Sequence, residues 1–363
     1  MSITELLDIL NNKNIVVWKE GCNVKFKAPK GSLTDELKEQ LKINKSMLLE
    51  YLDKEKNIYF KRDEINRYEE FDLTEIQSSY LLGRNTAFEL GGVGCHGYME
   101  IEYNELLDKD KIEIAWNKVI KKHDMLRAII YKNGKQKVQK DVPFVEIEEN
   151  FSIDEKELDL REKLANKQYK IGEWPMCDIA ITKINEKTLL HFSVDMIVAD
   201  YISMNIILKD LEDFYYNPEK EACNSSSYRD IVIYEKERKQ NKSANSQEDK
   251  KYWENKIENM GNSPFLPTLK TVDIEDSSFI QKSIFLNEDM WSKLCDLSKN
   301  IGVTVSAVVM SVLSEIVYYW SGTNKFCINT TLFKRSSLNI KDINEIVGDF
   351  TDVNVSAKIE NIY

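Results

Sequence analysis

Two aspartates, Asp195 and Asp200, stand five residues apart, separated by four apolar residues. They lie where the strand-like segment 188–194 gives way to a helical pattern at 203–216. Carboxylates flanked so closely by apolar side chains must find partners or become protonated. The pair therefore fits either a general acid or base or a buried structural ion pair. For Asp200 the structural options are a cap on the following helix and a bridge to an arginine.

Other reactive side chains give weaker signals. His191 and Asp195 are spaced for metal binding only in a helix, whereas Phe192 and Val194 continue a strand pattern. The glycine cluster before His96 does not match a phosphate-binding loop, and no GxSxG nucleophile motif is present. We therefore expect no metal site.

A basic hairpin is predicted near the N-terminus. Between residues 13 and 30 five lysines stand against a single acidic residue, Glu20. An open, basic strand edge can receive an acidic extended peptide, because backbone bonds give affinity and charge selects the partner. Alternatively, the lysines only protect the edge from aggregation. The receiving strand would consist of Val24, Lys25, Phe26 and Lys27.

The composition excludes several classes of protein. The 363 residues carry 61 acidic and 50 basic side chains, and the net charge of -11 argues against nucleic-acid binding. Six scattered cysteines, with no CxxC motif, fit a reduced cytoplasmic protein. The apolar segment 303–320 is too short and too polar for a membrane span, and we expect it to be a core helix.

Hydrophobic periodicity predicts the elements that position these residues. A helix–hairpin–helix module occupies residues 1–52, and a charged linker follows at 53–70. Mixed helices and strands then predict an α/β (α+β) fold in two lobes, 71–265 and 266–363. The helices are expected at 74–82, 111–122, 203–216, 235–260, 291–299 and 303–320, and the strands at 128–131, 188–194, 326–332 and 353–358.

Residues 1–52, above all VKFKAPKGSLTDELKEQL, resemble the tubulysin-type N-terminal docking domains of nonribosomal peptide synthetases. The resemblance implies that the strand 24–27 receives the C-terminal docking peptide of an upstream synthetase. Self-association through this small module is a further expectation.

The rest of the chain resembles the heterocyclization domains of the same synthetases, which are relatives of condensation domains. The motifs are FDLTEIQSSYLLGR, KHDMLR, SVDMIVADYIS, GVTVSAVVMSVLSEIVYYWSG, NTTLFKR and VGDFT, in this order. The resemblance implies a two-lobed fold like that of chloramphenicol acetyltransferase, with Asp195, Asp200 and Ser203 as the catalytic set. Met196 stands where condensation domains carry their usual catalytic histidine. The residues expected to support the site are Arg127, Asn329, Arg335, Asp349 and Thr351.

The implied reaction joins an acyl thioester to a carrier-bound Cys, Ser or Thr and then closes a thiazoline or oxazoline ring with loss of water. The partners would be acyl and aminoacyl carrier proteins, which deliver 4'-phosphopantetheine arms, and this chain would bind no cofactor itself. Two alternatives stay open: amide formation without ring closure, and a non-catalytic docking or scaffold protein.

Three further expectations concern the partners of the aspartates, the second lobe and the exposed apolar surface. Asp200 should bridge to Arg127 or Arg335, whereas Asp195 and Ser203 should face the tunnel. Family members continue beyond the VGDFT motif, so the second lobe is expected to be incomplete and the isolated chain inactive. An apolar surface beside residues 303–358 should then be exposed, with self-association or low solubility as the result.

Overall fold

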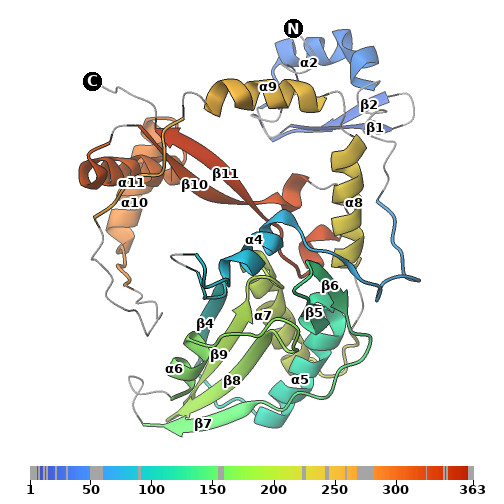
Figure 1. The fold of residues 1–363 in the computed structure, drawn as a ribbon, viewed down its shortest axis with the longest axis vertical. Coiled ribbons are helices and arrows are strands. Elements are labelled where there is room, and N and C mark those ends of the chain that lie inside the picture. The colour runs from blue at the N-terminus through green and yellow to red at the C-terminus, as the bar shows by residue number, and fades with distance from the viewer. Residues whose placement is uncertain are drawn as a thin grey trace. The chain divides into compact units, whose positions relative to one another are not determined.

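The structure, a computed structural model, divides the chain into two units (Figure 1). One unit comprises residues 1–61 and 233–241, and the other residues 62–232 and 242–363. Residues 1–5 of the predicted N-terminal module and the linker residues 53–59 lie outside the described residues. The described residues are 6, 9–10, 13, 15–20, 23–29, 32–49, 60–88, 91–153, 159–222, 226–241, 245–257, 260–267, 282–323, 325–337, 340 and 342–358.

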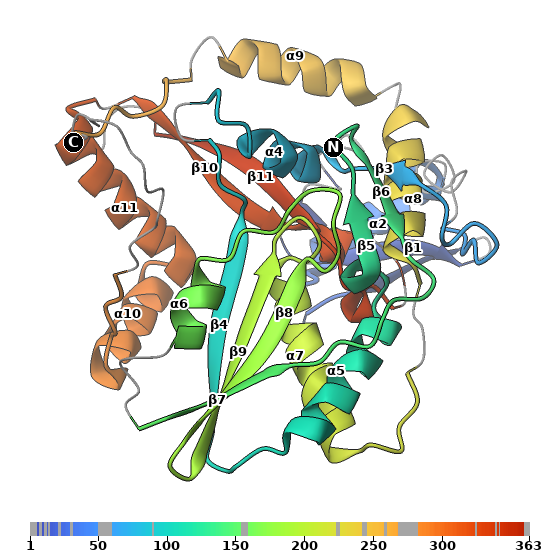
Figure 2. The same ribbon diagram turned by 60° about the horizontal axis from the view of Figure 1, so that its bottom comes forward.

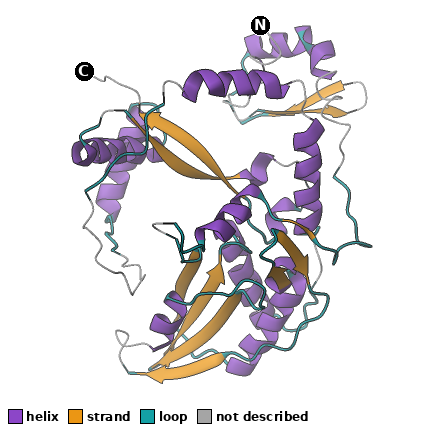
Figure 3. Cartoon of the chain, viewed as in Figure 1, coloured by secondary structure: helices purple, strands orange, loops and turns teal. Residues whose placement is uncertain are grey.

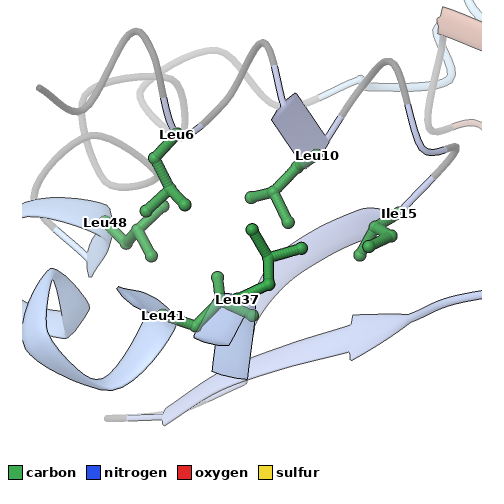
Figure 4. Close-up of a cluster of buried hydrophobic side chains, with 6 residues drawn as sticks. All are labelled: Leu6, Leu10, Ile15, Leu37, Leu41 and Leu48. Atoms are coloured by element: carbon green, nitrogen blue, oxygen red, sulfur yellow. The ribbon is translucent and has the colours of Figure 1, made fainter. Parts of the chain in front are cut away.

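The N-terminal unit contains the predicted hairpin. Strands β1 (Val16–Glu20) and β2 (Asn23–Lys27) pair antiparallel. Helix α2 (Asp35–Ile43) begins at Thr34, whose side chain accepts a 3.3 Å hydrogen bond from the Leu37 amide. Leucines spaced along the helices converge with Ile15 on one small core, which fixes the hairpin against the helices (Figure 4). That core consists of Leu6, Leu10, Ile15, Leu37, Leu41 and Leu48.

The large unit is built on a four-stranded sheet of order β4-β9-β8-β7 (Figure 2). Its strands are β4 (His96–Tyr103), β7 (Glu148–Ser152), β8 (Cys177–Ile184) and β9 (Lys187–Asp195), antiparallel except for the β7–β8 pair. Alternate residues of a strand face opposite sides. Phe192 meets the Trp116 ring of α5 (Lys109–Lys122) on one side, while residues on the other side pack against α6 (Asp159–Ala165).

A second, three-stranded sheet of order β3-β6-β5 lies in the same unit. Its strands are β3 (Phe71–Asp72), β5 (Ala128–Ile130) and β6 (Lys135–Val138). Helix α4 (Glu75–Gly83) is tied to this sheet and to the segment after β9, because Gln77 donates to Gln136 Oε1 and to the Ile197 carbonyl. The same unit also contains η1 (Asp124–Arg127) and α7 (Tyr201–Tyr216).

The later segments begin with a difference from expectation. The single helix predicted at 235–260 is wrong: the structure has two helices, α8 (Tyr228–Asn241) and α9 (Asn245–Ile257) (Figure 3). Asn and Ser, abundant at the break, favour helix ends over helix interiors. Beyond them lie α10 (Glu288–Asn300), α11 (Val305–Ser321), β10 (Phe326–Phe333), η2 (Lys334–Ser337), η3 (Ile343–Glu345) and β11 (Thr351–Lys358).

Helix α11 is apolar but exposed. None of its residues is buried, so the expectation of a core helix is wrong, whereas the expected exposure of apolar side chains here is confirmed. No single helix of the described chain is long and apolar enough to cross a membrane; α10 and α11 reach that length only together, and they are bent by 98°. Exposed side chains of α11 include Val309, Val312, Leu313, Ile316, Tyr319 and Trp320.

This exposure predicts a mild response to substitution. Because Val312 and Ile316 are 55% and 50% exposed, Val312→Ser with Ile316→Ser should change the free energy of unfolding by no more than about 0.5 kcal/mol per site. Ile207→Ala, in the buried face of α7, should lower it by about 2–5 kcal/mol. Urea denaturation measures both, and light scattering should show less self-association of the serine variant. A loss above about 2 kcal/mol for that variant would mean that α11 is covered.

Candidate functional site

Asp200 is fully buried and begins helix α7. Its Oδ1 accepts a 2.6 Å hydrogen bond from the Ser203 amide, and its Oδ2 a 3.2 Å bond from the Phe350 amide. Arg335 donates to the same Oδ1 at 2.9 Å. The two structural options, helix cap and salt bridge, are thus realised together, and the predicted bridge to Arg335 is confirmed.

Arg335 holds the segment 343–350 against α7. Its guanidinium also donates to Ser203 Oγ at 2.7 Å and to the carbonyls of Ile343 and Ile346 at 2.9 and 2.6 Å. Its guanidinium carbon lies 4.0 Å from the centre of the Phe350 ring. These bonds offset the desolvation of two buried charges, which is the condition under which such a pair is tolerated.

Two predicted positions need correction. Ser203 does not face a tunnel: it is fully buried, donates to the Gly348 carbonyl at 2.8 Å and accepts from the Gly348 amide at 3.0 Å. Arg127 does not reach Asp200, because it pairs with Asp124 at 2.7 Å and donates to carbonyls of its own neighbourhood. The motif spacing gave no information on which side of the helix Ser203 would point.

Asp195 ends strand β9 and pairs with Arg84, a residue that sequence reasoning missed as a site residue. The Ile197 amide donates to Asp195 Oδ1 at 3.1 Å, and Arg84 also donates to the Tyr169 carbonyl at 2.9 Å. Burial raises the pKa of the Asp195 carboxyl, and the guanidinium opposes this shift. A Cβ at Gly94 would lie 2.7 Å from the Arg84 guanidinium, so glycine provides the room.

A chain of polar groups continues from Asp195 along the same face of the sheet. His96, which pairs with Asp195 across β4 and β9, places Nε2 2.8 Å from Ser193 Oγ. The Tyr169 hydroxyl is 2.8 Å from the same Oγ. Burial lowers the pKa of His96, which favours the neutral imidazole. In the sequence, only the glycine cluster before His96 indicated that this residue could belong to a site.

Asp349 is a buried carboxyl on the segment that Arg335 holds. Its Oδ1 accepts a 3.0 Å bond from the Thr351 amide, while its Oδ2 has no hydrogen-bond partner among the described residues. Burial, with the Asp200 charge adding to it, raises the pKa of Asp349 to about 7. The Phe350 amide, between Asp349 and Thr351, donates to Asp200 Oδ2, and the supporting role of Asp349 and Thr351 stays a prediction.

The other predicted residues lie elsewhere or contribute differently. Asn329 is an exposed residue of β10, paired with Val355, and no described contact brings it to Asp200. The Met196 amide donates to the Cys95 carbonyl at 2.9 Å, and the Met196 side chain offers no proton-transfer group.

His191, on β9, is 2.8 Å from Thr182 Oγ1, so its ring is not directed to a metal with Asp195. No metal-binding group of three or more ligands occurs among the described residues.

In the N-terminal unit, β2 presents the predicted receiving residues. Val24 is half-buried and packs against the leucine core, whereas Lys25, Phe26 and Lys27 are exposed. Within the described chain, β2 pairs with β1 alone, so its other edge is not part of a sheet. The geometry fits strand addition.

Two family models match this chain. Residues 69–357 match the Condensation domain, and residues 3–54 match the TubC N-terminal docking domain.

Similar proteins include pyochelin synthetase PchF of Pseudomonas aeruginosa, 29% identical over 98% of this chain and 20% of its own length. Phenyloxazoline synthase MbtB of Mycobacterium tuberculosis is 25% identical over 78% of this chain and 20% of its length. The chain therefore spans about a fifth of these relatives. The EpoB cyclization-docking bidomain of Sorangium cellulosum aligns with a TM-score of 0.76 at 29% identity, covering 98% of this chain and 72% of that one.

Proposed function

The chain belongs to the condensation domain family of nonribosomal peptide synthetases and carries an N-terminal docking domain, and from this we propose that it serves in condensing and cyclising carrier-bound Cys, Ser or Thr. The observation that carries the proposal is the pair Asp195 and Asp200 at the β9–α7 junction, with Met196 between them. The structural similarity to the EpoB cyclization-docking bidomain also supports this proposal.

In the proposed reaction an upstream acyl thioester is transferred to the amine of the carrier-bound amino acid. The side-chain thiol or hydroxyl then attacks the new amide carbonyl, and water leaves to give a thiazoline or oxazoline. Carrier proteins would deliver both substrates on 4'-phosphopantetheine arms. Positioning the two substrates and moving protons are the tasks that fall to the protein.

Intact-mass spectrometry of loaded carrier proteins tests this function. Acyl-loaded and cysteinyl-loaded carriers are incubated with the chain, alone and together with a polypeptide supplying the remaining part of a condensation domain. A product lighter than the amide by one water supports cyclization. The amide without this loss favours simple condensation, and peptide docking without any product favours a scaffold role.

For the N-terminal unit we propose docking of an acidic C-terminal peptide from an upstream synthetase along β2. The exposed Lys25 and Lys27 beside Phe26 support this, because they present positive charge along the edge. Self-association of the module is an alternative use of the same edge.

The charge reversal Lys25→Glu with Lys27→Glu should slow peptide association and flatten its salt dependence. Exposed charge pairs contribute only about 0–1 kcal/mol each, so the effect should be on the association rate more than on the dissociation rate. Stopped-flow fluorescence with a labelled acidic peptide at several salt concentrations measures it. Lys38→Glu with Lys42→Glu, the same charge change on α2, is the matched control. Equal binding by both variants would contradict docking along β2.

A further inference from the structure

Strand β4 forms one border of the four-stranded sheet and, among the described residues, pairs with β9 alone (Figure 2). The Met196 amide donates to the Cys95 carbonyl at 2.9 Å, so the backbone groups of Cys95 face β9. In an antiparallel pair the backbone groups of successive residues point alternately toward the partner strand and away from it. The residues whose backbone groups point away from β9 are therefore His96, Tyr98, Glu100 and Glu102. We call this row of backbone groups the β4 edge.

The backbone groups of the β4 edge are unpaired, and they belong to residues that solvent reaches. Glu102 is exposed, the other three residues are half-buried, and none of these backbone groups has a hydrogen bond within the described chain. Such a row can receive an extended chain by strand addition. The side chains are already engaged, so the edge offers backbone groups alone. Their partners are Ser193 for His96, His191 for Tyr98, Arg161 for Glu100 and Lys187 for Glu102.

The β4 edge leads from a polar cavity to Asp195. At one end, His96 lies opposite Asp195 in the register of β4 and β9. At the other end, a cavity of about 240 Å³ lies beside Glu100 and Glu102. The strand covers roughly 20 Å from His96 to Glu102, at about 3.4 Å per residue. The cavity is also lined by Arg161, Lys187, Thr188, Ile184 and Leu189. Its two cations pair with the two glutamates at 2.6 and 2.8 Å, so its charges are balanced.

Resting on the function proposed above, we propose that the 4'-phosphopantetheine arm of a carrier protein pairs with the β4 edge as an extended chain. The arm carries two amide groups, each with one N–H donor and one carbonyl acceptor, and it has no row of side chains that would need pockets. Its amides bond to the backbone groups of the edge, its phosphate end lies at the polar cavity, and its sulfur end reaches Asp195. The β4 edge thus aligns the thioester with the site.

Hydrogen exchange at single-residue resolution tests the proposal on the whole chain. In the chain alone, the amides of Gly97 and Met99, which face β9, should exchange slowly, and those of the β4 edge rapidly. A holo-carrier, which bears the arm, should slow exchange at two or more amides of the edge, by up to about 100-fold at a free concentration of 100 times Kd. The amides on the free side of β7, the opposite border of the sheet, are the matched control and should keep their rates.

Two substitutions of Tyr98, in the middle of the β4 edge, provide a second test. Tyr98→Pro and Tyr98→Ala lose the same side-chain bonds, but proline also removes the N–H that points away from β9, and an edge strand tolerates it. Tyr98→Pro should therefore bind the holo-carrier about 2–10-fold more weakly than Tyr98→Ala, which is the effect of one hydrogen bond. Fluorescence anisotropy of a labelled holo-carrier measures the two Kd values, and urea denaturation establishes that both variants are folded.

The outcomes separate this inference from the proposed function. An edge that stays unprotected at a saturating holo-carrier concentration, or equal Kd values for two folded Tyr98 variants, overturns the inference. Equal protection by an apo-carrier also overturns it and assigns the edge to the carrier polypeptide. Protection that grows with the concentration of the chain alone overturns it in favour of a second copy of the chain. Protection by the holo-carrier, with loaded carriers that yield neither amide nor ring, supports the inference and contradicts the proposed function.

Discussion

Asp200→Ala should lower the free energy of unfolding by about 3–5 kcal/mol. The substitution leaves the Arg335 guanidinium, 3% exposed, without its carboxylate, and it removes the cap of α7. It also leaves the Phe350 amide without its acceptor. Chemical denaturation of both proteins at pH 7 measures the loss. A variant as stable as the wild type would contradict the structural role of Asp200.

A double variant separates the buried charge from the cap. Asp200→Ala with Arg335→Met removes both ions, so the penalty for an unpaired charge disappears and part of the stability should return. The cap is still missing, at a cost of about 0.5–2 kcal/mol. If the double variant were less stable than Asp200→Ala, the lost bonds of Arg335 to Ile343 and Ile346, and not the unpaired charge, would dominate.

Arg84→Met should destabilise the protein by about 3–5 kcal/mol at alkaline pH and by less in acid. Asp195, 1% exposed, then loses its cation, so burial raises its pKa further. A carboxyl whose pKa is raised in the folded state lowers stability as the pH rises through that pKa, and this penalty vanishes below the unfolded pKa of about 3.9. Urea denaturation from pH 5 to 9 should therefore show a difference between variant and wild type that grows with pH.

The exposed ion pair Lys135–Asp72 provides the control for Arg84→Met. These side chains are 43% and 36% exposed and lie 2.5 Å apart. Lys135→Met should change stability by only about 0–1 kcal/mol, with little pH dependence in this range. Equal losses for the two variants, or a loss for Arg84→Met that is independent of pH, would contradict a buried charge on Asp195.

The sequence alone predicts those features that depend on a local pattern of residues. Strand β9 follows from alternating apolar residues, and Asp200 is a cap because it precedes an amphipathic helix. Arg84 and His96 could not be placed in the same way, since their partners are 111 and 97 residues away in the chain. Periodicity marks α11 as apolar, but whether a helix is covered depends on its neighbours. The lobe boundary at residue 265 and the catalytic roles stay predictions.

The contact between Asp200 and Arg335 spans 135 residues, which has a consequence for synthesis of the chain on the ribosome. At about 5–20 residues per second, Arg335 is made roughly 7–27 s after Asp200. During that interval the strands β4, β8 and β9 are available to pair, while the carboxylate that begins α7 still lacks its cation. Until the segment 335–350 emerges, the first turn of α7 therefore stays in contact with water. We expect this end of the helix to be the last part of the lobe that becomes protected from water.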